Sequence, residues 1–281
     1  AQALRDGFLA AQYQAQSQGI SQPQVTLYDS TQYSQAIDAL NQAKREGVQW
    51  MIGPLEKDKV AQLASSGALP LPTLVLNYAE QATSDSSIYQ FGLAPEDEAR
   101  SAAIRAWHDG KRRMATLSTR DDWSQRANRA FITEWERLGG ILIGQELVDQ
   151  PAAVANQMGE LLKIKQSENR ANRISSILGD VLAQPTPRQD LDALFLAATP
   201  LQARQIKPTL AFQYAADLPV YATSHAYQID SSGMQNTDLD GLLIAEIPWL
   251  LEQNDPLYSD VTGNWPQAGG ALGRLYAMGV D

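Results

Sequence analysis

Short apolar runs alternate with longer amphipathic segments along this chain, and the alternation limits the fold more than any other feature. The short runs are rich in branched and aromatic residues and are bounded by Gly, Pro or Asp, which is typical of strands. The longer segments carry apolar residues at spacings of three and four, which is typical of helices buried on one face. The pattern predicts strands at residues 24–28, 48–52, 72–76, 88–92, 113–117, 141–143, 192–197, 219–222 and 241–245.

Helical segments separate these strands. They are predicted at residues 1–19, 33–46, 56–66, from Pro95 to about residue 110, 123–138, 151–183 with a polar break at 166–169, from Pro200 onwards, and around residues 272–276. Strands that alternate with helices form parallel sheets covered by helices on both faces. The pattern is interrupted between Tyr89 and Pro95 and then starts again. We therefore expect an α/β protein with two Rossmann-like lobes: residues 1–92 as lobe 1, 93–224 as lobe 2, and 225–281 returning to lobe 1.

Net charge, cysteine content and hydropathy together limit the partners and the chemistry of this chain. The formal net charge is -10, whereas a nucleic-acid-binding protein needs a basic face that neutralises phosphates. We therefore expect no nucleic-acid partner. The one basic cluster, Lys111-Arg112-Arg113, precedes a predicted strand and is interpreted as its solvated beginning. The absence of cysteine rules out disulfides and thiolate chemistry, and no apolar run reaches the ~18 residues that would span a membrane.

Motifs that carry catalytic chemistry are missing. The sequence contains no H-E-x-x-H, G-x-S-x-G, G-x-x-x-x-G-K-[ST] or S-x-x-K pattern. Its two histidines, His108 and His225, are far apart in sequence. His108 is interpreted as matching the dipole at a helix C-terminus, and His225 is a candidate for lining a cleft. We therefore predict no catalytic residues, no metal and no cofactor.

Two acidic stretches allow more than one interpretation. Asp121-Asp122 either caps the helix that follows or forms a metal or acid–base pair. Residues 236–241 resemble the start of a calcium loop, but Ile247 stands where that loop needs a bidentate Glu. We favour capping for the first stretch and a turn before a strand for the second.

Position in the predicted sheets indicates where a ligand would bind. Ligands of parallel α/β proteins lie beyond the carboxyl ends of the strands, where helix N-termini direct backbone N–H groups outwards. The alternative is that the residues there are ordinary loop and cap residues. The cleft candidates chosen on this basis are Gly53, Pro54, Asn77, Tyr78, Ser118, Thr119, Asp122, Thr199, Ser224, His225 and Glu246.

Several segments, taken in order, carry a resemblance to a known family. They are Trp50–Leu55, Ile88–Ala99, Asp192–Pro200, Leu218–Ser224, Asp240–Leu243 with Ile247–Trp249, and Gly273–Gly279. Their order and spacing are similar to the type I periplasmic-binding-protein fold. More narrowly, they resemble the C-terminal domain of LpoA-type penicillin-binding-protein activators, and the resemblance extends over essentially the whole chain.

The resemblance implies an outer-membrane lipoprotein that faces the periplasm and stimulates a class A penicillin-binding protein, above all its transpeptidase step. It also implies an N-terminal helical-repeat domain and a lipidated cysteine, neither of which is in this chain. Contact with the membrane is therefore expected only through a lipid anchor absent from this chain. By the same comparison, the first strand of the fold and its last elements after Asp281 are expected to be missing.

Two functions remain open from the sequence. The leading hypothesis is a non-enzymatic activator that works by protein contact with a class A penicillin-binding protein. The alternative is a periplasmic binding protein or sensor whose lobes close on a small solute, such as an amino acid or a peptidoglycan fragment. The resemblance implies that solute-binding relatives use Ser or Thr after the Gly-Pro loop. Leu55-Glu56-Lys57 stands there instead, so we expect no amino acid to bind at that point.

Overall fold

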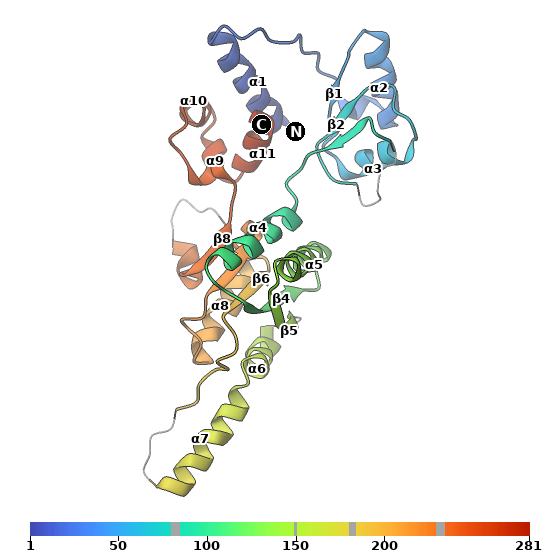
Figure 1. Ribbon diagram of the computed structural model, residues 1–281. Helices are drawn as coiled ribbons and strands as arrows, with labels where there is room; N and C mark the ends of the chain where they lie inside the picture. Colours follow the sequence, from blue (N-terminus) through green and yellow to red (C-terminus); the bar gives the residue numbers. More distant parts are fainter. Residues whose placement is uncertain (80–84, 149–150, 180–183, 229–233) are drawn as a thin grey trace. The chain divides into compact units, whose positions relative to one another are not determined.

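The computed structural model describes residues 1–79, 85–148, 151–179, 184–228 and 234–281 (Figure 1). The chain divides into two compact units, the first formed by residues 1–94 and 252–281 and the second by residues 95–251. Each unit contains one parallel sheet. The predicted α/β class with parallel sheets is therefore confirmed.

The sheet of the second unit has five parallel strands in the order β5-β4-β6-β7-β8. Their bounds are β4 Arg113–Thr119, β5 Ile141–Val148, β6 Ala193–Ala197, β7 Val220–Thr223 and β8 Leu242–Ala245. This is a doubly wound order, and its direction reverses between β4 and β6. The carboxyl ends of these two strands are thus the place where proteins of this architecture commonly bind ligands.

Helices cover both faces of this sheet. The helices α4 Pro95–His108 and α5 Asp122–Arg137 pack on one face, and α6 Pro151–Leu161 and α8 Pro200–Phe212 pack on the other. The unit also contains α7 Ile164–Leu178, which follows α6, and the short α9 Pro248–Leu251. Side chains of β6 alternate between two cores. Phe195 stacks on Phe131 of α5, with ring centroids 4.0 Å apart, whereas Leu194 and Leu196 pack in the cluster that contains Ile206 of α8. Such burial on both sides explains why β6 reads as a continuous apolar run.

The first unit contains a smaller sheet in the order β1-β2-β3. Its strands are β1 Met51–Ile52, β2 Thr73–Val75 and β3 Ile88–Gln90, and its neighbouring helices are α2 Ala36–Arg45 and α3 Lys57–Ser65. Leu40, Leu63 and Val75 form a fully buried core between these helices and the sheet.

Helices from the two ends of the chain also pack together in the first unit. They are α1 Gln2–Ser17, α10 Pro256–Asn264 and α11 Gly273–Val280. Two glycines permit the close approach of α1 and α11. A Cβ atom on Gly7 would lie 2.2 Å from the carbonyl oxygen of Tyr276, and one on Gly279 would lie 2.0 Å from that of Leu4. No side chain fits at either position, because the obstacle is backbone on the facing helix.

Three local predictions differ from the structure. Residues 24–28 form no strand, because no described strand pairs with them, and Leu27 is 63% exposed. The helical break lies at Leu162–Lys163, where Lys163 has a left-handed φ of 57°, and not at 166–169. Residues 225–251 stay in the second unit, because β8 pairs with β7, whereas the sequence placed the return at residue 225.

Replacing Gly7 or Gly279 with alanine is expected to separate α1 from α11. The added methyl group meets a carbonyl oxygen that cannot move without shifting a helix, so each change should lower the free energy of unfolding by about 1–3 kcal/mol or more. Thermal and urea unfolding followed by circular dichroism measures the loss. Gly263→Ala in α10 is the matched control, because a Cβ atom there meets nothing within 4 Å. Equal stability of all three variants would contradict the packing described here.

Candidate functional site

The predicted site residues fall into two groups, one in each unit. In the second unit they follow the strands: Ser118 and Thr119 end β4, Asp122 begins α5, Thr199 precedes α8, Ser224 and His225 follow β7, and Glu246 follows β8. In the first unit Gly53 and Pro54 follow β1, while Asn77 and Tyr78 follow β2. The geometry of each group is described separately below.

Ser124 occupies the point where the strand order of the second unit reverses. Its hydroxyl accepts a hydrogen bond from the amide of Thr119 at 2.8 Å and donates one to the carbonyl of Ala197 at 2.6 Å. It thereby joins the carboxyl ends of β4 and β6, and its side chain is completely buried. The usual ligand crevice is therefore bridged from within by a side chain of α5.

Hydroxyl groups beside this bridge are also engaged within the protein. The Thr119 hydroxyl donates to the Asp121 carboxylate at 2.9 Å. Thr199 forms a capping box with Gln202, so the first turn of α8 is satisfied by its own residues. Asp121 stands at the N-cap of α5 but makes no side-chain cap hydrogen bond. The predicted side-chain cap by Asp121 is therefore wrong, because its carboxylate accepts from Thr119 instead, whereas Asp122 lies in the first turn of α5, as the predicted match to the helix dipole requires.

Glu98 of α4 fastens the end of β7. Its carboxylate accepts hydrogen bonds from the Ser224 amide at 2.7 Å and the Ser224 hydroxyl at 2.8 Å. Burial raises the pKa of Glu98, but the contacts with His225 and Ser224 outweigh burial and bring the pKa below its ordinary value of 4.5. The carboxylate is thus held charged, with Ser224 completely buried against it.

Aromatic and ionic contacts join the other residues at these strand ends. The ring of His225 stacks on Trp123, with centroids 4.5 Å apart, and its Nδ1 lies 3.7 Å from the Glu98 carboxylate. Arg126 of α5 pairs with Glu96 at 2.6 Å and also contacts Asp122. The stack joins α5 to the turn after β7, and the ion pairs join α5 to α4.

The group in the first unit is built mainly from backbone contacts. The Asn77 amide donates to the carbonyl of Leu55 at 3.2 Å, and its Oδ1 accepts from the amide of Tyr78 at 2.9 Å. Gly53 has a φ of +110° and precedes Pro54 through a cis peptide bond. A left-handed φ of this size is readily adopted only by glycine. Asn77 therefore ties together the loops after β1 and β2.

Four residues that shape the strand ends of the second unit were not predicted from the sequence. They lie near the beginnings of two helices, where the sequence gives them no special role: Glu98, Trp123, Ser124 and Arg126. Glu98 and Ser224 are separated by 126 residues, so no local pattern connects them. An acidic residue in the first turn of a helix is usually explained by its interaction with the helix dipole. The sequence alone does not show whether such an acid instead binds the end of a distant strand.

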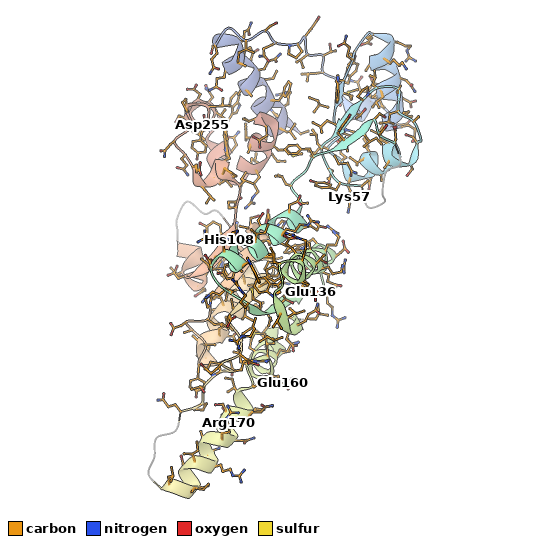
Figure 2. The ribbon with its side chains drawn as sticks, viewed as in Figure 1. Lys57, His108, Glu136, Glu160, Arg170 and Asp255 are labelled. Carbon is orange, nitrogen blue, oxygen red and sulfur yellow. The ribbon has the colours of Figure 1, made fainter. Side chains whose placement is uncertain are left out.

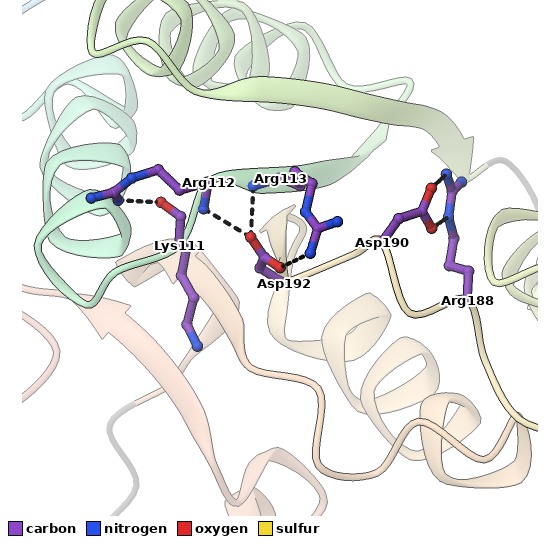
Figure 3. Close-up of polar contacts among 6 residues, drawn as sticks. All are labelled: Lys111, Arg112, Arg113, Arg188, Asp190 and Asp192. Atoms are coloured by element: carbon purple, nitrogen blue, oxygen red, sulfur yellow. Dashed lines mark hydrogen bonds and ion pairs between the residues drawn. The ribbon is translucent and has the colours of Figure 1, made fainter.

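The basic cluster of the sequence lies at the opposite, amino ends of the strands (Figure 3). Asp192 accepts hydrogen bonds from the amides of Arg112 and Arg113, each at 2.9 Å, and from the Arg113 side chain at 2.9 Å. Burial raises the pKa of Asp192, but these donors outweigh it and lower the pKa. Arg112 also covers the ring of Trp107 at 3.7 Å. The cluster therefore has a structural use at the start of β4.

The remaining expectations from the sequence concern metal binding, His108, the calcium-like stretch and membrane-spanning helices. No group of three or more His, Cys, Asp or Glu side chains in the described ranges could hold a metal ion. His108 is the last residue of α4, as its interpretation requires (Figure 2). Residues 237–239 of the calcium-like stretch belong to a 3-10 turn, Met234–Leu239, that precedes β8. None of the helices in the described part of the chain combines the length and apolarity needed to cross a bilayer.

Two α/β units with parallel sheets and with polar residues at the strand ends define a periplasmic-binding-protein-like fold. The structure of the LpoA (YraM) C-domain from Haemophilus influenzae, a regulator of PBP1A, superposes with a TM-score of 0.74 at 24% identity, covering 100% of this chain and 78% of that chain. A putative branched-chain amino acid ABC transporter from Chromobacterium violaceum gives a TM-score of 0.66 at 27% identity, covering 99% of this chain and 79% of that chain.

The chain belongs to the family described as LppC putative lipoprotein, which matches residues 1–281. It is 31% identical over 279 residues to the penicillin-binding protein activator LpoA of Edwardsiella ictaluri, covering 94% of this chain and 40% of that protein. The chain thus spans about two fifths of the length of this curated relative. The resemblance drawn from the sequence is confirmed.

Replacing Glu98 with glutamine tests the contact between α4 and β7. Since the pKa of Glu98 is lowered on folding, its charge stabilises the protein above about pH 4.5, and this stabilisation disappears as the pH falls through the lower folded-state pKa. The variant should lose about 1–3 kcal/mol of unfolding free energy at pH 7.

Urea unfolding at pH 7 and pH 3 measures the effect. The difference between Glu98→Gln and the unaltered protein should shrink at pH 3. Glu136→Gln on the exposed side of α5 removes the same charge and should leave stability nearly unchanged (Figure 2). A loss that is identical at both pH values would show that the charge of Glu98 is not what stabilises this contact.

Proposed function

We propose that this chain activates a class A penicillin-binding protein by direct protein contact and catalyses no reaction itself. The similarity of almost the whole chain to proteins named penicillin-binding protein activator LpoA carries the proposal. In this role the chain stimulates peptidoglycan synthesis, chiefly the transpeptidase step, by stabilising an active state of the synthase. The chain can shift the synthase toward an active state only if it binds that state more tightly than the inactive state.

The strand-end chemistry of the second unit supports protein contact over solute binding. The hydroxyls of Thr119, Ser124, Thr199 and Ser224 all have partners within the chain. A solute held by these four hydroxyls would have to displace these bonds. Groups that remain on the outside include the half-exposed ring of His225 and the exposed carboxylate of Asp122. Such a surface is better suited to the rim of a protein interface.

The lipoprotein description of the family supports a periplasmic location. We place the protein at the periplasmic face of the outer membrane, attached through a lipid anchor that lies outside the residues of this chain. From there it would reach a synthase in the opposite membrane. No nucleic-acid role is proposed, since the net charge is -10.

A reconstituted synthesis reaction tests the proposal. The purified chain is added in increasing amounts to a purified class A penicillin-binding protein with its lipid-linked precursor, and crosslinked products are quantified. We expect saturable stimulation of crosslinking and a measurable complex, with no product from the chain alone. A solute-binding protein of the same fold at equal concentration is the control. Absence of both stimulation and binding would refute the activator role, and turnover by the chain alone would refute its non-catalytic nature.

Free amino acids are expected to leave the melting temperature of the chain unchanged. A ligand at 100 times its Kd adds about 2.7 kcal/mol of stability, which a thermal-shift measurement detects easily. Leucine is the first amino acid to test, because the similar transporter structure is named for branched-chain amino acids. A clear upward shift with leucine would favour the solute-binding alternative.

A further inference from the structure

A polar cavity lies on the α5 side of the second unit's sheet. It has a volume of about 310 Å³ and is lined by Ser118 of β4, by Gln125, Asn128 and Arg129 of α5, and by Gln145 and Leu147 of β5. This volume is at the lower end of the range for small-molecule sites. The cavity belongs entirely to the second unit, beside the edge strand β5.

The face of the sheet under this cavity carries polar side chains. A parallel sheet covered by helices usually has apolar residues there. Met114, Thr116 and Ser118 share one face of β4, since side chains alternate along a strand. Met114 packs in the same cluster as Phe131 of α5, so this is the face that α5 covers. Thr116 is 0% exposed and Ser118 4% exposed. Two buried hydroxyls therefore replace apolar packing under α5.

Two buried oxygen atoms here have no partner among the described residues. They are Oγ1 of Thr116 and Oδ1 of Asn128. An unpaired buried polar group is destabilising, so its presence in a native protein needs an explanation. The Asn128 side chain lines the cavity although the residue is only 2% exposed, and Thr116 is paired in register with Gln145, which also lines it. A polar molecule in the cavity would supply the partner that the Asn128 oxygen lacks.

The cavity also has an uncompensated cation. Arg129 is exposed and forms no ion pair or hydrogen bond with the described residues. The other arginines of α5 are paired, Arg126 with Glu96 and Arg137 with Glu134. An unpaired guanidinium in a chain of net charge -10 is suited to binding a carboxylate, which it recognises through two parallel hydrogen bonds.

We propose that this cavity binds an acidic sugar, meaning a monosaccharide unit with hydroxyl and N-acyl groups that also carries a carboxylate. Three amide side chains line it, and amides both donate and accept hydrogen bonds, as sugar hydroxyl and N-acyl groups do. The Gln125 amide nitrogen already donates to the Arg120 carbonyl at 3.1 Å, which leaves its oxygen for the sugar. Leu147 is 41% exposed and supplies an apolar contact. Arg129 binds the carboxylate.

Titration of the isotopically labelled chain followed by NMR tests the proposal. N-acetylmuramic acid and N-acetylglucosamine form a matched pair of probes, because the first carries a carboxylate that the second lacks. We expect saturable shifts of the Gln125, Asn128, Arg129 and Gln145 amide signals with N-acetylmuramic acid. The neutral sugar should bind at least about tenfold more weakly, since it loses the charge-assisted contact.

Variants separate the carboxylate from the rest of the sugar. Arg129→Gln should reduce the affinity for N-acetylmuramic acid to that for N-acetylglucosamine. Arg170→Gln on α7 removes the same charge from an exposed position that does not line the cavity, and it should change neither affinity (Figure 2). Asn128→Leu should abolish binding of both sugars without unfolding the protein, because it replaces an unpaired buried amide with an apolar side chain.

Three results would overturn the proposal. The first is no saturable shift at these residues with N-acetylmuramic acid. The second is equal binding of acetate, which would make the cavity a simple anion site. The third is unchanged affinity of Arg129→Gln. None of these results depends on a synthase, so the sugar site and the activator role are tested independently.

Discussion

The parallel pairing of β4 with β6 is the interaction on which the second unit depends. The two strands are in register from Met114 and Ala193 to Ser118 and Ala197, and they are buried on both faces. Each end of the pair is fastened by one side chain. The Asp192 carboxylate holds the amino end of β4, and the Ser124 hydroxyl joins the two carboxyl ends. The loops that follow β4 and β6 therefore start from one common frame.

This frame determines what the strand ends can bind. In solute-binding proteins of this architecture, polar groups beyond the strands are directed to the ligand. Here Glu98 and Ser124 take up those groups within the chain. Buried oxygen atoms without a partner among the described residues lie on Thr116 and Asn128 under α5 and on Thr223 at the end of β7. The polar groups of Ser124 and Ser224 are thus satisfied within the chain, whereas those of Thr116 and Asn128 are not.

Patterns within single segments predicted most of the second unit. The apolar run of β6 and the proline and acids that begin α4 placed these elements within a residue or two. The strand at residues 24–28 failed because propensity alone does not form a strand without a hydrogen-bonding neighbour. The partners of Ser224 and the unpaired oxygen of Asn128 lay beyond prediction for a related reason. They depend on which distant segments meet, and no spacing in the sequence expresses that.

Gly7 and Gly279 have a consequence for the order in which the two units fold. They allow α1 to pack closely against α11, so the first unit is assembled from residues 1–94 and residues 252–281. The second unit is one continuous stretch of chain and can fold without the first. The first unit cannot be completed in this way, because α1 finds its partner α11 only on the far side of the second unit in the sequence.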